Sequence, residues 1–244
     1  MAGPVFKAVL FASAPFIGMA AAGAMAAWWK PGRRIRSYIQ HLASGIVFGA
    51  VGTEVLPDVM HRQNPVAASI GFAVGVAAML GIRAMSRRAE NSGGSRGNLR
   101  YSLLAAVGVD VFVDGMLIGV GFAMGQRQGL LLVFALTGCA ISLGLATASA
   151  ILRAGNSRVR SAMWAGLIGI FSPIGAGVGA LIASQLTGSW MEAVLAFTCA
   201  ALLYLVAEEL LLEAHETEAE RETALTTATF FLGFLAILVA DMLM

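Results

Sequence analysis

Long apolar segments alternate with short polar segments along the whole chain. Each apolar segment is near or above the ~20 residues that an α-helix needs to cross ~30 Å of hydrocarbon. The segments cover about residues 5–28, 35–59, 66–86, 101–125, 129–153, 161–184, 189–213 and 223–243. The pattern predicts an all-α integral membrane protein of about eight transmembrane helices, which form a single domain over residues 1–244. The longest polar stretch, residues 87–100, predicts a loop between the third and fourth helices.

The composition excludes an ordinary soluble domain. Hydrophobic residues make up 58% of the chain and charged residues 12%, against roughly 45–50% and 25% in soluble globular proteins. The mean hydropathy is +0.80, so the surplus apolar surface must face lipid. The two cysteines, Cys139 and Cys199, fall inside apolar segments and form no CxxC metal motif. The net charge of +2 comes from basic residues spread over short loops, which argues against nucleic acid as a partner.

The first apolar segment has some features of a secretory signal peptide. Lys7 lies at its start, and Ala24-Met25-Ala26 resembles a cleavage site. The apolar run is longer than the core of a signal peptide, and no hydrophilic mature domain follows it. We therefore interpret this segment as the first transmembrane helix.

The basic residues of the loops are distributed unequally between the two sides of the membrane. The loops after the first, third, fifth and seventh helices share one side, and their basic residues are Lys30, Arg33, Arg34, Arg36, Arg83, Arg87, Arg88, Arg96, Arg100, Arg153, Arg158, Arg160 and Arg221. The other side has Lys7, Arg62 and Arg127. Because basic loops stay in the cytoplasm, residues 87–100 are expected to be cytoplasmic and both termini extracytoplasmic. We expect the protein to reside in the plasma (inner) membrane.

Two carboxylates lie near the middle of the fourth helix. Asp110 and Asp114 are four residues apart, which places them on one helix face about one turn apart. Ionisable groups at this depth are costly and mark ion pathways or proton relays. Two such carboxylates repel each other unless a cation lies between them or one of them binds a proton. A divalent cation would stabilise the pair, whereas the alternative is a neutral acid that hydrogen-bonds to neighbouring helices.

Other polar residues of the helices are weaker candidates. Cys139 and Ser142 in the fifth helix and Ser172 in the sixth are candidate metal-ligating (Cys139) or pore-lining residues. A buried cysteine is more commonly a small apolar residue, and a serine in a helix also bonds to its own backbone. His41 in the second helix, with Glu208 and Glu209 in the seventh, is a candidate exit or secondary metal site. The alternative is that these three side chains reach interfacial water.

The second and seventh helices have similar ends. Glu54 and Asp58 lie four apart at the end of the second helix, and Glu209 and Glu213 lie four apart at the end of the seventh. These ends are predicted on opposite sides of the membrane, which is typical of the inverted repeats of transporters. The alternative is that acidic residues simply mark where each helix reaches water.

Three helices also carry segments that resemble a known family. The fourth helix contains Asp110-Val111-Phe112-Val113-Asp114-Gly115, which resembles the motif H-N-x-P-[ED]-G of the ZIP (Zrt/Irt-like) metal transporters. The fifth contains Cys139-Ala140-Ile141-Ser142-Leu143-Gly144-Leu145-Ala146, which is similar to the ZIP motif H-E-I-P-E-G-L-A. The sixth contains Ser172-Pro173-Ile174-Gly175, which is similar to E-P-x-G. The chain is identified by this resemblance as a divergent ZIP member.

The resemblance implies eight helices in a 3+2+3 arrangement with an inverted repeat, and a homodimer. It implies a two-metal site at mid-membrane, of which Asp114 keeps an acidic ligand and Asp110 replaces a histidine. The second metal position has lost nearly all its ligands, because Ala140 and Leu143 stand at ligand positions. A single site built from Asp110, Asp114 and Cys139 remains.

We therefore expect a carrier that moves a divalent metal ion of the Zn, Fe or Mn class into the cytoplasm. Helices one to three and six to eight would move against helices four and five to alternate access. The metal is a substrate, and no cofactor is expected. Carboxylates and hydroxyls favour Mn²⁺, Mg²⁺ or Fe²⁺, whereas a thiolate at Cys139 favours zinc. One alternative is a ZIP-like scaffold that moves protons or another solute, and another is a non-transporting sensor or partner. No nucleophile–base pair or cofactor loop indicates an enzyme.

Overall fold

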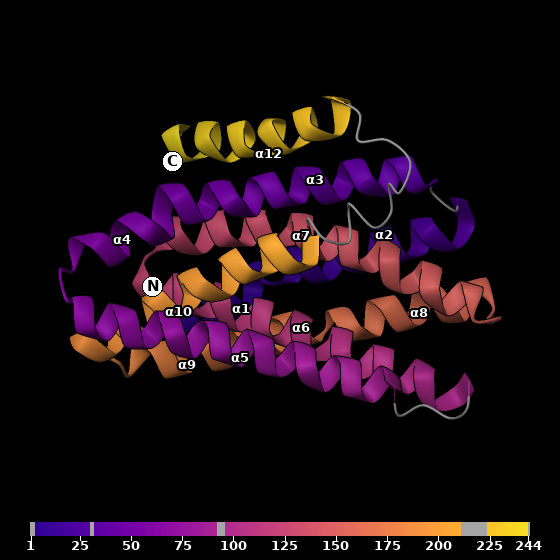
Figure 1. The fold of residues 1–244 in the computed structure, drawn as a ribbon, viewed down its shortest axis with the longest axis horizontal. Helices are drawn as coiled ribbons and strands as arrows, with labels where there is room; N and C mark the ends of the chain where they lie inside the picture. Colours follow the sequence, from indigo (N-terminus) through magenta and orange to yellow (C-terminus); the bar gives the residue numbers. More distant parts are fainter. Residues whose placement is uncertain (1–2, 30–31, 92–95, 211–223, 244) are drawn as a thin grey trace.

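The computed structural model describes residues 3–29, 32–91, 96–210 and 224–243, and these residues fold almost entirely into helices (Figure 1). Eight segments are long and apolar enough to cross a membrane. In chain order, spans 1 to 8 are Pro4–Trp29, Arg34–His61, Pro65–Ala84, Leu104–Met124, Gln126–Arg153, Arg158–Ser184, Ser189–Ala207 and Leu225–Leu243. The predicted all-α membrane fold with eight helices is confirmed.

Half of the spans are not continuous α-helices. Span 1 consists of α1 (Pro4–Phe11) and α2 (Ser13–Trp29), and span 6 of α8 (Arg158–Gly169) and α9 (Phe171–Ser184). Span 2 consists of α3 (Arg33–Ala50), the π-helix η1 (Val51–Val55) and α4 (Leu56–His61), and span 7 of α10 (Ser189–Tyr204) and the π-helix η2 (Leu205–Leu210). The other spans lie within α5 (Pro65–Asn91), α6 (Arg96–Met124), α7 (Gln126–Arg153) and α12 (Ala224–Leu243).

Prolines account for three of these interruptions. Pro15, Pro57 and Pro173 each lie in the first turn of the helix that follows the interruption, in α2, α4 and α9. Proline has no N–H to donate and its ring clashes with the preceding turn, so the backbone ladder opens just before it. In a membrane such openings are tolerated where neighbouring helices or a cavity satisfy the freed backbone groups.

The predicted cytoplasmic loop is shorter than the hydropathy indicated. Within residues 87–100, α5 continues to Asn91 and α6 begins at Arg96. Arginine and glutamate are good helix formers, so the helices extend past the point where the apolar pattern ends. The predicted end of the seventh helix at 213 and the start of the eighth at 223 lie outside the described residues.

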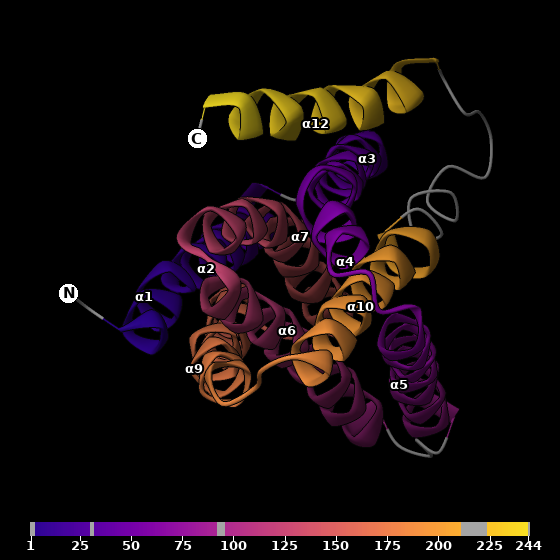
Figure 2. The same cartoon turned by 90° about the vertical axis from the view of Figure 1, so that its left-hand side faces the viewer.

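The spans group into two bundles (Figures 1 and 2). In the first bundle, spans 1, 4, 5 and 6, α6 packs along α9 and α2 packs along α7 and α8. In the second bundle, spans 2, 3, 7 and 8, α12 packs along α3 and α5 packs along α10. Figure 2 shows α12 lying over α3, with α5 beside α10 on the other side.

These pairings confirm the predicted inverted repeat in a 3+2+3 order. Exchanging spans 1, 2 and 3 with 6, 7 and 8, and span 4 with 5, converts the pairing of α6 with α9 into that of α7 with α2. The same exchange converts the pairing of α3 with α12 into that of α10 with α5. The interrupted spans 1 and 6 correspond to each other, and so do spans 2 and 7 with their π-helices.

Glycines allow the helices within each bundle to touch backbone to backbone. In the first bundle, a Cβ on Gly115 or Gly119 of α6 would overlap the carbonyl oxygens of Ser172 or Ala176 in α9. In the second, a Cβ on Gly45 would overlap the Phe230 carbonyl. Small residues at such positions bring membrane helices close enough for extensive van der Waals contact.

The contact between the two bundles is looser. Gly138 of α7 faces Ala43 and Ile46 of α3, and a Cβ there would lie 3.8 Å from their atoms. This is an ordinary van der Waals distance, so the two bundles are not interlocked through backbone contacts at this point.

Candidate metal site

The two aspartates of α6 lie at the middle of a membrane span. Asp114 is the central residue of the 21-residue span Leu104–Met124, and Asp110 lies one turn earlier. Asp114 is buried, with 6% of its surface exposed, and Asp110 is half-buried. Both are therefore well inside the apolar part of span 4, where an ionised carboxylate needs a partner.

Ser172 lies beside this part of α6. It is the second residue of α9, directly after the interruption at Ile170, and its carbonyl contacts Gly115. Gly175 in turn contacts the Phe112 carbonyl, so the first turn of α9 runs alongside the turn of α6 that carries Asp114. The Ser172 hydroxyl is buried and has no hydrogen-bond partner among the residues that the structure describes. An unsatisfied buried hydroxyl of this kind is commonly completed by a water molecule or an ion.

Cys139 and Ser142 come from α7, which packs antiparallel to α6 after the connection at Gly125. Both side chains are buried. Cys139 is 14 residues after Gly125 and Asp110 is 15 residues before it. At about 1.5 Å per residue, the two lie at nearly the same depth.

The predicted ligands do not form a site from ionisable and thiol groups alone. In the part of the chain that the structure describes, no three His, Cys, Asp or Glu side chains lie close enough together to hold a metal ion. A metal bound by Asp110 and Asp114 would therefore also need hydroxyl, carbonyl or water oxygens, which suit hard divalent ions. The Ser172 hydroxyl is a candidate for one of these oxygen ligands, because its residue contacts Gly115, which directly follows Asp114.

The residues of the predicted exit site are only partly described. His41 is buried in α3, and its Nδ1 donates a hydrogen bond to the Ser37 carbonyl at 2.9 Å. Glu208 and Glu209 belong to η2, but their side chains lie outside the described part of the structure. Because α3 contacts η2, the sequence segments of this predicted site are neighbours in the fold.

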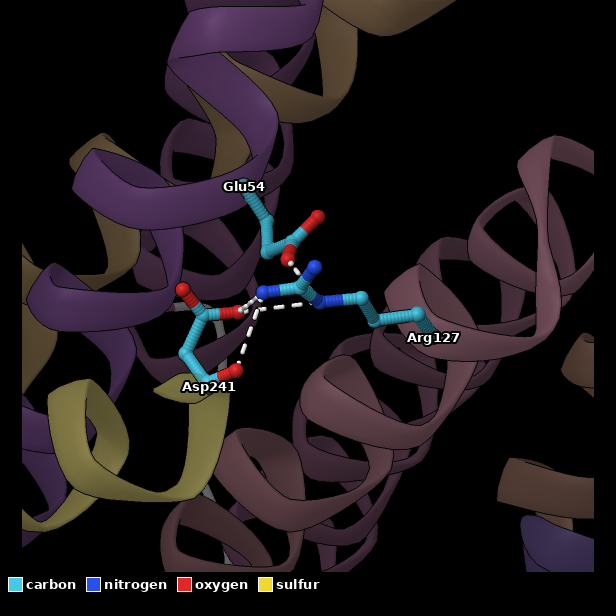
Figure 3. A network of polar contacts seen from close by, with 3 residues as sticks. All are labelled: Glu54, Arg127 and Asp241. Atoms are coloured by element: carbon cyan, nitrogen blue, oxygen red, sulfur yellow. Dashed lines mark hydrogen bonds and ion pairs between the residues drawn. The ribbon is translucent and has the colours of Figure 1, made fainter. Parts of the chain in front are cut away.

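The structure also brings together three charged residues that the sequence did not connect (Figure 3). Arg127, at the start of α7, lies between Glu54 of η1 and Asp241 at the end of α12. Its Nε is 3.0 Å from Glu54 Oε1, and its Nη2 is 2.7 Å from Asp241 Oδ1. The sequence did contain a signal for this cluster: spans 2, 5 and 8 carry opposite charges at the same predicted end. Charges inside a membrane span usually find a partner, so these three residues could have been predicted to meet.

Comparison with known proteins identifies the family. The family model described as ZIP zinc transporter matches residues 86–241, which is more than half of the chain. The chain belongs to the ZIP family. The ZIP match includes all of span 4, span 5 and span 6, and therefore Asp110, Asp114, Cys139 and Ser172.

A curated relative is similar over a comparable length. "Zinc transporter GufA" of Myxococcus xanthus is 34% identical over 162 residues, which cover 63% of this chain and 59% of the relative. The match thus spans less than two thirds of that protein. Together with the eight apolar spans, ZIP membership makes this chain an integral membrane protein.

Proposed function

We propose that this ZIP protein carries a divalent metal ion across the membrane into the cytoplasm and has no enzymatic activity. The observation that carries the proposal is Asp114, which is buried at the centre of a span inside the segment that matches the ZIP model. The relative at 34% identity is named a zinc transporter, which supports a divalent ion as the substrate. A buried carboxylate at this depth is retained where it serves an ion pathway.

The proposed site binds one ion. Asp110 and Asp114 supply the negative charge, and the unpartnered hydroxyl of Ser172 supplies a neutral oxygen. These oxygen ligands alone favour Mn²⁺ or Fe²⁺. Cys139 lies at nearly the same depth on α7 but forms no three-ligand group with the two aspartates in the described structure, so its thiolate would join the site, and favour zinc, only if α7 moves closer to them. The proposed substrate is therefore a Zn, Fe or Mn class ion.

The packing of the helices indicates that spans 4 and 5 do not move alone during transport, as the order of the helices suggested, but together with spans 1 and 6. Spans 4 and 5 were expected to be separate from the other six, but α6 interlocks with α9 of span 6 and α7 with α2 of span 1. Close backbone contacts through glycine give extensive van der Waals packing, which favours movement of the packed helices as one unit. We therefore propose that the first bundle, spans 1, 4, 5 and 6, moves as one body against the second.

The test is uptake of metal by the purified protein in liposomes. Initial rates are measured for Zn²⁺, Mn²⁺, Fe²⁺ and Mg²⁺ against protein-free liposomes, with an internal proton indicator recorded in parallel. Uptake of at least one divalent ion is expected. Proton flux without metal uptake would instead support the alternative that Asp110 and Asp114 relay protons, and no flux of either kind would support a sensor or partner role.

The proposed orientation predicts a labelling pattern. Thr187 lies in the exposed connection between spans 6 and 7 and Ala154 in that between spans 5 and 6. In intact cells, a membrane-impermeant maleimide is expected to label Thr187→Cys and to label Ala154→Cys only after permeabilisation. The native Cys139 and Cys199 are buried and give a low background. The reverse pattern would place both termini in the cytoplasm.

We also propose that the protein resides in the plasma (inner) membrane and forms a homodimer. Cell fractionation tests the location, and native mass spectrometry of the purified protein tests the oligomeric state.

A further inference from the structure

The geometry points to Glu54, Arg127 and Asp241 as a latch that holds the two bundles together at one end. We propose that this end is the extracytoplasmic one and that the latch opens once in each transport cycle. The part played in a cycle rests on the proposed function, whereas the latch itself rests on the contacts that Arg127 makes with the two acids.

Arg127 uses several atoms of its guanidinium group on the two acids (Figure 3). Nε lies 3.0 Å from Glu54 Oε1 and donates a hydrogen bond of 3.2 Å to Asp241 Oδ1. Nη2 donates to Asp241 Oδ1 at 2.7 Å and to the Asp241 backbone carbonyl at 2.9 Å. Hydrogen bonds between charged groups in which a planar guanidinium uses several donors are stronger and geometrically more specific than a simple ion pair.

The three residues belong to different bundles. Arg127 starts α7 of the first bundle, whereas Glu54 and Asp241 belong to η1 and α12 of the second. Two hydrogen bonds between described helices lie within single bundles, Lys7–Gln126 at 2.7 Å in the first and Asn64–Ser189 at 3.0 Å in the second. Moving one bundle against the other at this end must therefore break the contacts of Arg127.

The exposure of the three side chains is suited to a contact that holds the two bundles together and can also open. The Glu54 side chain is 9% exposed and that of Asp241 is 16% exposed, so without Arg127 two acids would remain in a poorly solvated place. The Arg127 side chain is 49% exposed, so water can replace its partners when the bundles separate. The latch is 12 residues from Cys139 along α7, or about 18 Å, so it controls the end of the bundle interface and not the metal ligands.

The π-helix explains how Glu54 reaches this position. In η1 the Leu56 N–H bonds to the Val51 carbonyl, five residues back, and Pro57 follows directly. The wider turn rotates the side chains that precede it relative to a continuous α-helix. Glu54 thereby faces the start of α7 instead of lipid.

The test measures how readily the bundle interface opens, without any metal. Cys139 is 4% exposed and follows Gly138, which contacts Ala43 and Ile46 of α3 across the interface. In a Cys199→Ala background and with EDTA present, we follow alkylation of Cys139 by a water-soluble maleimide in nanodiscs. Arg127→Gln is expected to raise the rate about tenfold, which corresponds to about 1.4 kcal/mol in the opening equilibrium. Asp241→Asn is expected to give a smaller rise, because Glu54 and the residue 241 carbonyl still hold Arg127.

The matched control is Lys7→Gln, which removes a basic residue near the same end but breaks a hydrogen bond inside the first bundle. Its alkylation rate is expected to equal that of the unchanged protein. A rate for Arg127→Gln that also equals it would overturn the latch. If Arg127→Gln does not give a single folded species in gel filtration, Asp241→Asn and Arg127→Lys decide by the same comparison. Because no transport is measured, a failure of the proposed metal transport leaves this result unaffected.

Discussion

Asp114→Asn is expected to lower the initial rate of metal uptake in liposomes by about tenfold or more, because it removes a buried negative charge from the ion's path. The amide keeps the shape of the side chain and one of its acceptor oxygens, so the loss is one of charge and not of packing. Asp110→Asn is expected to have a smaller effect, since Asp110 is only half-buried. Calorimetric titration of each variant with the transported ion is expected to show weaker binding in the same order.

The matched control for this pair is Asp58→Asn. Asp58 is also a carboxylate in a membrane span, but it is half-buried in α4 near the end of span 2. Its uptake rate is expected to stay close to that of the unchanged protein. Unchanged uptake in both Asp114→Asn and Asp110→Asn would exclude the proposed site and leave the ZIP membership intact.

Gly119→Ala is expected to destabilise the first bundle. A Cβ at this position would lie 2.5 Å from the Ala180 amide nitrogen and 3.0 Å from the Ala176 carbonyl carbon, and these backbone atoms of α9 cannot turn aside. Overpacking of this kind costs about 1–3 kcal/mol. The melting temperature is expected to fall by about 2–4 °C for each kcal/mol in a chain of this size.

Gly81→Ala provides the control for this substitution. Gly81 lies in α5, and a Cβ there would have no atom within 4 Å. Since alanine favours a helix over glycine, its melting temperature is expected to be unchanged or slightly higher. Equal melting temperatures for the two variants, measured in the same detergent, would contradict the close packing of α6 on α9.

Much of the fold could be predicted from the sequence because hydropathy is a local property. Whether residues 129–153 cross a membrane depends on the residues of that segment alone, and the structure has a helix over Gln126–Arg153. The ends were less predictable, as α5 shows by continuing to Asn91, because a helix does not stop where its apolar residues stop. A proline inside an apolar segment opens the backbone ladder of its helix, and the structure has an interruption at Ile170, three residues before Pro173.

Only part of the candidate metal site could be predicted from the sequence. The four-residue spacing of Asp110 and Asp114 already places both on one face of a helix. That Ser172 lies beside them depends on Gly115 and Gly175 bringing α6 and α9 into contact. Which glycine of one helix meets which residue of another is not encoded in either segment alone.

The sequence by itself determined that this chain has eight membrane helices and carboxylates in the middle of the fourth. Hydrophobic burial in lipid and helix periodicity act within one segment, so they can be read without its neighbours. Only the tertiary structure decided that Arg127 meets Asp241, 114 residues away, as well as Glu54. It also decided that spans 1, 4, 5 and 6 form one bundle. A pairing between distant helices depends on how their surfaces fit, and only the folded chain brings those surfaces together.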